Sequence, residues 1–173
     1  MSVNGTKFSH CSTTGIVGAL SCSIAALEME CTSYDDCCSS STSASGLNAI
    51  HALSVYGSQS QNPVEVFQCA FVLCPRNHYK NDETVRFQDE CVVAFKENNL
   101  TENLEREEMI TTISGPSASD SLLHCNVHKC VSGVMFLLNT DTTIEKCNII
   151  HNKPDGDRHE LIYNTKSTIL TNC

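Results

Sequence analysis

Histidine and cysteine gather in one short segment of this 173-residue chain, His124-Cys125-Asn-Val-His128-Lys-Cys130. Four such side chains within seven residues could bind zinc, with Cys74 and His78 as further ligands. If the segment is a strand with a bend, however, the two cysteines point inward and the two histidines point outward. One ion cannot then reach all four side chains, so we expect no metal centre here and no bound cofactor.

Two other groups of residues could do chemistry. Asp155-Gly-Asp157 with Glu160 could hold calcium weakly through carboxylates, but it lacks the spacing of an EF-hand loop, and a solvated turn is the simpler interpretation. A cysteine nucleophile would need one of the seven histidines beside it, and no motif places such a pair together. We therefore predict that the chain is not an enzyme, and we assign no catalytic residue.

The composition restricts the partners and the location. There are 20 acidic and 11 basic residues, and the net charge of −9 argues against nucleic acid and anionic membranes as partners. The 12 cysteines exceed what an ordinary cytosolic protein carries. No signal peptide is visible, and no apolar run has the length of a membrane span. We expect either an intracellular protein or a fragment of a longer chain.

A nine-residue pattern recurs and decides the predicted fold. Position 1 is apolar, position 4 is Cys or Asn, position 6 is apolar, and position 9 is again Cys or Asn. Four full copies begin at Val66, Phe95, Leu122 and Ile144, at intervals of 29, 27 and 22 residues. One half-copy, Phe8-Ser-His-Cys11, precedes the full copies, and another, Leu170-Thr-Asn-Cys173, comes after them. Cys31 is a candidate for a degenerate copy. Such a period is typical of one coil of a β-solenoid.

The geometry of a stacked coil explains why Cys and Asn interchange. Short strands joined by tight bends stack at about 4.8 Å, and positions 1, 4, 6 and 9 point inward. Asn can bond the backbone groups that a bend brings inside, and Cys fills the same small space. Burial should raise the pKa of these thiols and keep them unreactive. The predicted ladder consists of Cys11, Cys69, Cys74, Asn98, Asn103, Cys125, Cys130, Cys147, Asn152 and Cys173.

The segments between the copies complete the predicted organisation. Alternation predicts strands in which Val134, Phe136 and Leu138 share one face, and in which Leu161 and Tyr163 share another. Residues 37–46 are rich in Ser and Thr, so we expect a mobile loop with Cys37 and Cys38 as reactive thiols. The sequence thus predicts a single all-β solenoid segment over residues 1–173, with irregular coils of about 20–30 residues and long loops. We expect a fragment or an incomplete solenoid whose open ends favour end-to-end self-association.

The alternation of apolar and Cys/Asn positions resembles the right-handed parallel β-helix superfamily. That superfamily includes pectin-lyase-like carbohydrate enzymes and many non-enzymatic surface proteins. Phe95-Lys-Glu-Asn98 matches the Phe-x-x-Asn tetrapeptide of the polymorphic outer-membrane-protein-like repeats of chlamydial and trichomonad surface proteins. Phe8-Ser-His-Cys11 is its Cys variant. The resemblance implies a right-handed parallel β-helix with a surface or adhesion role, and it supplies no catalytic residue.

One tripeptide could still point to an enzyme. Asn139-Thr-Asp141 matches the tripeptide with which β-helical polygalacturonases seat an acid. Glycoside hydrolysis needs at least two carboxylates about the scissile bond, and the further Asp-Asp, Gly-His-Gly and Arg-Ile-Lys motifs of those enzymes do not follow here. We interpret the tripeptide as a polar turn before a strand.

Three hypotheses for the function result. The first is a non-enzymatic β-helical scaffold, at the cell surface or outside the cell, that presents loops to a protein or glycan partner. The second is a carbohydrate-active β-helix enzyme with a degenerate or missing site. The third is an intracellular cysteine-rich regulator that binds zinc.

Overall fold

The chain folds into parallel β-sheets. The computed structural model describes residues 1–24, 26–39, 49–57, 62–74, 79–80, 82–88, 91–106, 109–113, 120–132, 134–154 and 160–173. These residues contain 25 strands and no helix. Consecutive strands fall into different sheets, and each paired strand lies beside the strand four elements later in the chain. The prediction of an all-β protein is confirmed, and its sheets are parallel.

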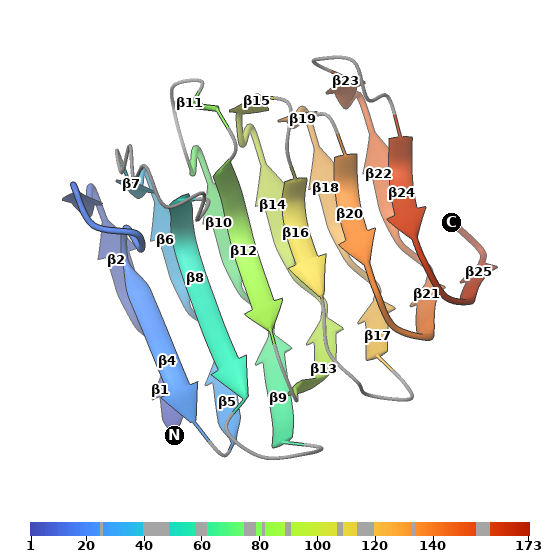
Figure 1. Ribbon diagram of the computed structural model, residues 1–173, viewed down its shortest axis with the longest axis horizontal. Helices are drawn as coiled ribbons and strands as arrows, with labels where there is room; N and C mark the ends of the chain where they lie inside the picture. The colour runs from blue at the N-terminus through green and yellow to red at the C-terminus, as the bar shows by residue number, and fades with distance from the viewer. Residues whose placement is uncertain are drawn as a thin grey trace.

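Three large sheets run along the molecule (Figure 1). The first sheet contains β1 (Ser2–Asn4), β5 (Leu27–Glu30), β9 (Asn62–Phe67), β13 (Cys91–Lys96), β17 (Asp120–Leu123), β21 (Thr142–Glu145) and β25 (Thr168–Thr171). The second contains β2 (Lys7–Ser9), β6 (Ser33–Asp35), β10 (Ala70–Val72), β14 (Asn99–Thr101), β18 (Asn126–His128) and β22 (Asn148–Ile150). The third contains β4 (Leu20–Ile24), β8 (Ala49–Gly57), β12 (Asp82–Gln88), β16 (Met109–Ile113), β20 (Val134–Leu138) and β24 (Glu160–Asn164).

Three small two-stranded sheets accompany the large ones. They pair β3 (Ser12–Thr13) with β7 (Cys38–Ser39), β11 (Tyr79–Lys80) with β15 (Glu105–Arg106), and β19 (Val131–Ser132) with β23 (Lys153–Pro154). They lie along one edge of the molecule, at the top of Figure 1.

The strand register aligns the nine-residue pattern from copy to copy. In the first sheet, position 1 is occupied in turn by Val3, Met29, Val66, Phe95, Leu122, Ile144 and Leu170. In the second sheet, position 6 is occupied by Phe8, Tyr34, Phe71, Leu100, Val127 and Ile149. We call the residues at one position in successive repeats a column. The columns show two complete copies, beginning at Val3 and Met29, that the sequence pattern did not recognise.

The repeats are less even than we expected. Subtracting successive position 1 numbers gives intervals of 26, 37, 29, 27, 22 and 26 residues. The interval of 37 residues, between Met29 and Val66, exceeds the predicted range of about 20–30. It includes the nine-residue strand β8.

The core is continuous through these columns. Met29, Val66, Phe95 and Leu122 are fully buried at position 1. At position 6, parallel rings stack through the first three repeats. Ring centroids are 4.9 Å apart for Phe8–Tyr34 and 5.0 Å apart for Tyr34–Phe71, with interplanar angles of 8° and 6°. These separations are close to the spacing of neighbouring strands, so one aromatic residue per repeat fills the column.

The third sheet differs from the other two because its strands β8 and β12 carry buried side chains on both faces. Every residue from Ile50 to Val55 in β8 and from Glu83 to Phe87 in β12 is buried. In β24, Ile162 pairs with the buried Phe136 and packs against the core, whereas Tyr163 is 40 % exposed. The predicted strand that carries Leu161 and Tyr163 on one face is present as β24; the face of Tyr163 is the outer one, and the side chain of Leu161 is not described.

Candidate interaction surfaces and the side-chain ladder

The register places the predicted ladder residues in two columns. Position 4 contains Cys69, Asn98, Cys125, Cys147 and Cys173, and position 9 contains Cys11, Cys74, Asn103, Cys130 and Asn152. Seven of these ten side chains are buried, Cys11 and Asn152 are half-buried, and Cys173 is exposed. Thr6 and Thr32 occupy position 4 in the first two repeats, and Cys37 occupies position 9 in the second.

Each asparagine of the ladder bonds the bend of the preceding repeat. Asn98 Oδ1 accepts a hydrogen bond from the Cys69 N–H at 2.8 Å, and Asn98 Nδ2 donates to the Val66 carbonyl at 2.8 Å. Asn103 makes the same two bonds to Cys74 and Phe71, at 2.8 and 3.0 Å. Asn152 repeats them with Cys130 and Val127, at 2.8 and 3.0 Å. One amide thus satisfies both a donor and an acceptor that each bend brings inside.

Cysteine makes a weaker version of the same two contacts. The Cys125 N–H donates to Cys147 Sγ at 3.4 Å, and the Cys147 thiol donates to the Leu122 carbonyl at 3.5 Å. The Cys125 thiol likewise donates to the carbonyl of Phe95 at 3.3 Å. A thiol has both a weak donor and a weak acceptor. This chemistry, beyond its small size, explains why Cys replaces Asn in the columns.

A second regularity accompanies the ladder. Among the described residues, those with positive φ all lie at position 3 or position 8, directly before a ladder residue. Position 3 is occupied by Gly5, Cys31, Gln68, Glu97, His124, Lys146 and Asn172, and position 8 by His10, Asp36, Leu73, Glu102, Lys129 and His151. Their φ angles range only from 49° to 58°. One left-handed residue therefore makes each bend and turns the next side chain inward.

Cys31 and Cys37 do not occupy the places that we predicted. Cys31 is an exposed bend residue with φ of 49°, and the adjacent Thr32 is the ladder residue. Cys37 is fully buried in the core, and Cys38–Ser39 form strand β7. The prediction of a loop is therefore wrong for residues 37–39, because Cys37 completes a pattern copy that begins at Met29. Residues 40–46 lie outside the described residues.

The stacked thiols change one another's pKa. A hydrogen bond from Cys74 lowers the pKa of Cys37 to about 6, although burial opposes this effect. A hydrogen bond with Cys125 lowers the pKa of Cys147 to about 7. At Cys69, burial dominates and raises the pKa to about 11. The expectation that burial raises the pKa of the ladder thiols holds at Cys69 and is wrong at Cys147, where the hydrogen bond with Cys125 outweighs burial. The same hydrogen bond, together with burial, raises the pKa of Cys125. Cys37 was predicted to be a reactive loop thiol, and its pKa is lowered although its side chain is buried; its reactivity stays a prediction.

All twelve cysteines are free thiols. Cys125 and Cys130 are buried, whereas His124 is exposed and His128 is half-exposed on the outer side of the bends. Among the described residues, no three His, Cys, Asp or Glu side chains gather where they could hold a metal ion. His78 and Asp155-Gly-Asp157 lie outside the described residues, and the side chain of Glu160 is not described either.

Asn139-Thr-Asp141 lies where the chain passes from β20 to β21, and hydrogen bonds hold all three side chains. Thr140 is buried and donates to the Asp120 carboxylate, whose Oδ1 accepts the Val93 N–H at 2.7 Å. Asn139 Oδ1 accepts from the Thr165 hydroxyl at 3.1 Å, and Asp141 Oδ1 accepts from the Ser167 N–H at 3.1 Å. The tripeptide connects neighbouring repeats, which is a structural role.

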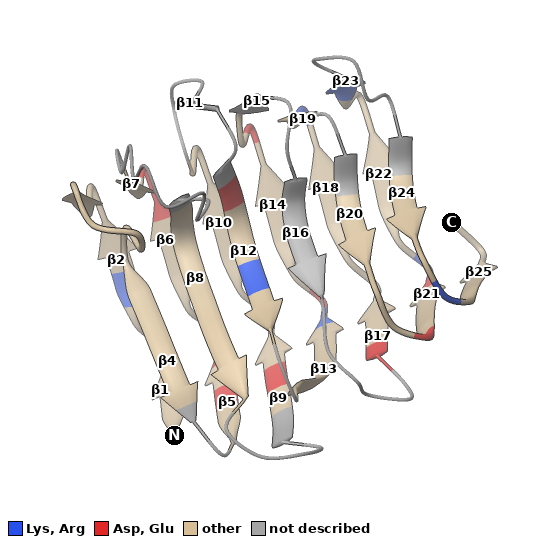
Figure 2. Cartoon of the chain, in the orientation of Figure 1, with Lys and Arg blue, Asp and Glu red and all other residues tan. Residues whose placement is uncertain are grey.

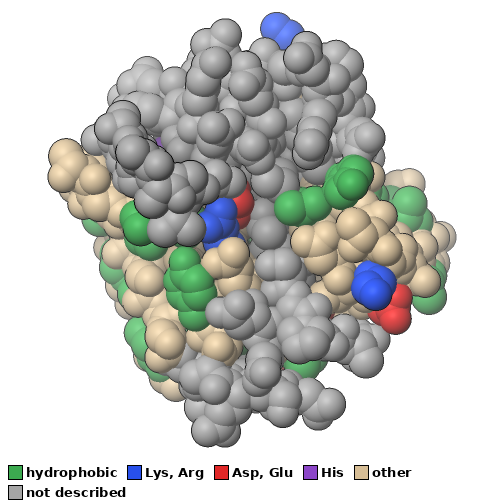
Figure 3. Space-filling model, viewed as in Figure 1, with side chains coloured by type: hydrophobic (Ala, Val, Ile, Leu, Met, Phe, Trp, Pro, Cys, Tyr) green, Lys and Arg blue, Asp and Glu red, His purple; other side chains and the backbone are tan. Residues whose placement is uncertain are grey.

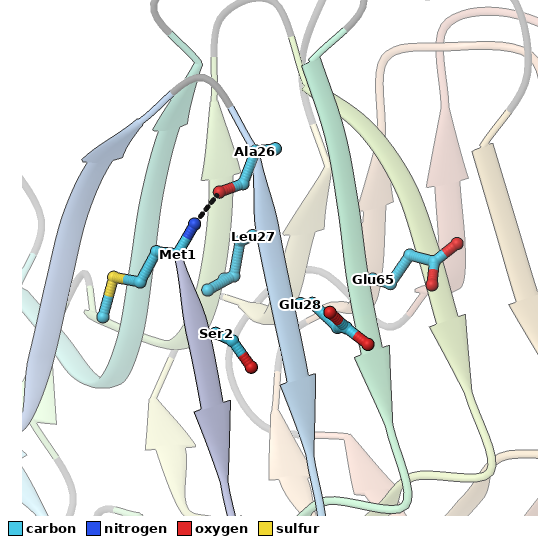
Figure 4. Close-up of a pocket in the computed structure, with 6 residues that line it drawn as sticks. All are labelled: Met1, Ser2, Ala26, Leu27, Glu28 and Glu65. Atoms are coloured by element: carbon cyan, nitrogen blue, oxygen red, sulfur yellow. Dashed lines mark hydrogen bonds between the residues drawn. The ribbon is translucent and has the colours of Figure 1, made fainter.

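A groove with acidic residues opens on the outer side of the first sheet. It has a volume of about 530 Å³ and is lined by Met1, Ser2, Ala26, Leu27, Glu28 and Glu65. Glu28 and Glu65 pair directly across β5 and β9, and both are exposed. Figure 4 shows their side chains on neighbouring strands; at the other side of the groove the Met1 ammonium donates to the Ala26 carbonyl at 2.8 Å. Figure 2 shows the corresponding acidic bands on β5 and β9.

A buried ion pair in the third sheet escaped the sequence analysis. Arg86, the basic residue that Figure 2 colours blue in β12, donates from Nε to Glu83 Oε2 at 2.7 Å and from its terminal nitrogen to Glu83 Oε1. Its side chain is 7 % exposed and that of Glu83 is 2 % exposed. Burial would lower the pKa of Arg86, but the bonds and charge of Glu83 outweigh burial, and the pKa is raised. On the face shown in Figure 3, basic side chains lie against acidic ones near the centre and at the right of the view.

Comparisons with known proteins return no relative. No protein-family model matches the chain, no curated protein matches, and no solved structure matches. Within the part of the chain that the structure describes, no helix is long and apolar enough to cross a membrane.

Proposed function

We propose that the chain is a segment of a right-handed parallel β-helix and works as a non-enzymatic interaction scaffold. The observation that carries this proposal is the ladder. Positions 4 and 9 hold Cys, Asn or Thr side chains that bond bend backbone within their own repeat or in the preceding one. Polar groups at these inward positions are used for stacking, which leaves the outer faces to recognise a partner.

The groove on the first sheet is the surface that we assign to this role. Glu28 and Glu65 present two neighbouring carboxylates without a basic residue between them in the register. Together with the net charge of −9, they favour a cationic protein segment or an amino-sugar glycan over an acidic polymer. Pectin-like substrates are themselves polyanions, so this surface argues against the carbohydrate-active alternative. A role at the cell surface or outside the cell agrees with such a scaffold.

The test measures binding and turnover on the same ligands. The chain is applied to arrays of basic and acidic peptides and of neutral, acidic and amino-sugar glycans, while released reducing ends are assayed in parallel. We expect basic ligands to bind without turnover, and the double substitution Glu28→Gln/Glu65→Gln to weaken binding severalfold. Glu145→Gln, at the other end of the same sheet, is the matched control. Release of reducing ends, no binding, or binding that the double substitution leaves unchanged would contradict the proposal.

A further inference from the structure

Two histidines from adjacent repeats meet on the outer surface of the second sheet. His128 ends strand β18, and His151 follows the adjacent strand β22. His128 Nε2 and His151 Nδ1 are 3.2 Å apart, and the ring centroids are 5.4 Å apart with an interplanar angle of 53°. His151 is exposed and His128 is half-exposed, so the space around the two nitrogens is open to solvent.

The distance between these nitrogens suits a shared metal ion. Two nitrogens bound to zinc at about 2.0–2.1 Å with a tetrahedral angle lie about 3.3–3.4 Å apart. The observed 3.2 Å is close to that separation, and both rings must rotate so that their lone pairs turn from each other towards the ion. Neutral imidazole is the commonest protein ligand of late transition metals.

The ladder fixes the backbone on both sides of the pair. Asn152, the residue after His151, accepts from the Cys130 N–H and donates to the Val127 carbonyl. Val127 and Cys130 flank His128 in the sequence, so one buried amide ties the two bends together. The His128 carbonyl also accepts the Glu102 N–H at 3.0 Å. The two rings are thus presented by a rigid frame, as a preorganised site requires.

The charges nearby do not oppose a cation. Lys129 lies between Glu102 and His151 in the column at position 8, and its ammonium contacts Glu102 Oε1 at 3.7 Å. That ion pair draws the ammonium towards the preceding repeat, away from His151. The net charge of −9 favours the approach of a divalent cation.

We propose that His128 Nε2 and His151 Nδ1 form a surface site for a late transition-metal dication such as Zn²⁺. Without metal, one nitrogen donates a hydrogen bond to the other. For binding, the donating ring transfers its proton to its other nitrogen, so both lone pairs face the ion and no net proton is lost. Water or a group from a partner completes the coordination. The site uses no thiol and does not depend on the proposed scaffold function.

The test titrates Zn²⁺ into the folded chain while imidazole ¹⁵N resonances and binding heat are recorded. We expect His128 Nε2 and His151 Nδ1 to shift at one equivalent. His128→Gln and His151→Gln should each weaken Zn²⁺ binding by at least about 10-fold, since each removes one of two ligands. His124→Gln, another exposed histidine at a bend, is the matched control and should leave the affinity unchanged.

Cobalt distinguishes imidazole from thiol ligands. Co²⁺ bound at the two histidines should lack a thiolate-to-metal charge-transfer band, whereas binding at the cysteines would produce one. Circular dichroism of each variant verifies that the fold is intact. Unchanged Zn²⁺ affinity in both histidine variants, a thiolate band, or unshifted resonances of the two rings would overturn the proposal.

Discussion

Two regions of the molecule bury polar groups in different ways. One is the set of bends that carry the ladder, and the other is strands β8 and β12 of the third sheet. Each bend uses one left-handed residue followed by one small side chain that bonds a neighbouring backbone group. In β12, by contrast, the buried charges form one pair, Glu83 and Arg86, whose side chains bond each other.

This difference decides how stability is distributed. A repeated bond can be lost at one bend while the other bends keep theirs, so each ladder residue should contribute a modest share. A single buried ion pair has no such substitute. When one partner is removed, the other remains as an uncompensated charge in a site that excludes water. We therefore expect the third sheet to be far more sensitive to single substitutions.

The largest effect should come from breaking the buried ion pair. Glu83→Gln leaves the Arg86 guanidinium buried with a neutral partner, which should cost about 3–5 kcal/mol of the free energy of unfolding. Urea denaturation followed by circular dichroism measures this loss. Glu102→Gln, which breaks the exposed pair with Lys129, is the control and should cost at most about 1 kcal/mol.

The double substitution Glu83→Leu/Arg86→Met sharpens the same comparison. It removes both charges and fills the space with apolar side chains, so most of the lost stability should return. If Glu83→Gln cost no more than Glu102→Gln, the pair would not be isolated from water, and the contrast between the two regions would fail.

The sequence predicts the bends better than the third sheet for a physical reason. A ladder site tolerates only small side chains that can both donate and accept, so the same residue types recur at fixed spacing and are visible as a pattern. Thr32 and Tyr34 broke that pattern only because we restricted position 4 to Cys and Asn and position 6 to aliphatic residues and Phe. Thr32 satisfies a bend carbonyl through its hydroxyl at 3.1 Å, and Tyr34 occupies the aromatic column.

The ion pair and the histidine pair leave no comparable signal. The pair Glu83 and Arg86 occurs once. The paired residues in the neighbouring strand β8 are Ile50 and Ser54, so no repeated pattern in the sequence indicates the ion pair. His128 and His151 are 23 residues apart. They meet only because the interval between Leu122 and Ile144 is 22 residues and the two histidines sit at positions 7 and 8. An error of one residue in the register would separate them.

A smaller loss of the free energy of unfolding should follow when one residue of the ladder is replaced. Asn98→Ala leaves the Cys69 N–H and the Val66 carbonyl buried without their partner, which should cost about 2–3 kcal/mol. Asn98→Cys restores a weak donor and acceptor and should cost less than half as much. The free energy of unfolding in urea again provides the measurement.

Asn99→Ala is the control for that experiment, because Asn99 lies next to Asn98 on the outer side of the second sheet. Its Oδ1 accepts bonds from Thr101 and Asn126 at 2.9 and 2.8 Å, but it is half-exposed, so water can replace them. We expect a cost below about 1 kcal/mol. Equal losses for Asn98→Cys and Asn98→Ala would mean that the thiol does not imitate the amide.

The smallest effect concerns the left-handed residues, and its sign should reverse between two sites. His124 has a φ of 55° and is exposed, so His124→Gly relieves backbone strain and should raise the free energy of unfolding by about 0.5–1 kcal/mol. Gly5 already occupies the equivalent position in the first repeat with a φ of 58°. Ser121→Gly, in the extended strand β17 of the same repeat, should lower that free energy by about 0.5–1 kcal/mol, because glycine loses more backbone entropy on folding. His124→Val should also be destabilising, since a β-branched side chain resists positive φ. If both glycine substitutions changed stability in the same direction, the bends would not require the left-handed conformation that all the repeats share.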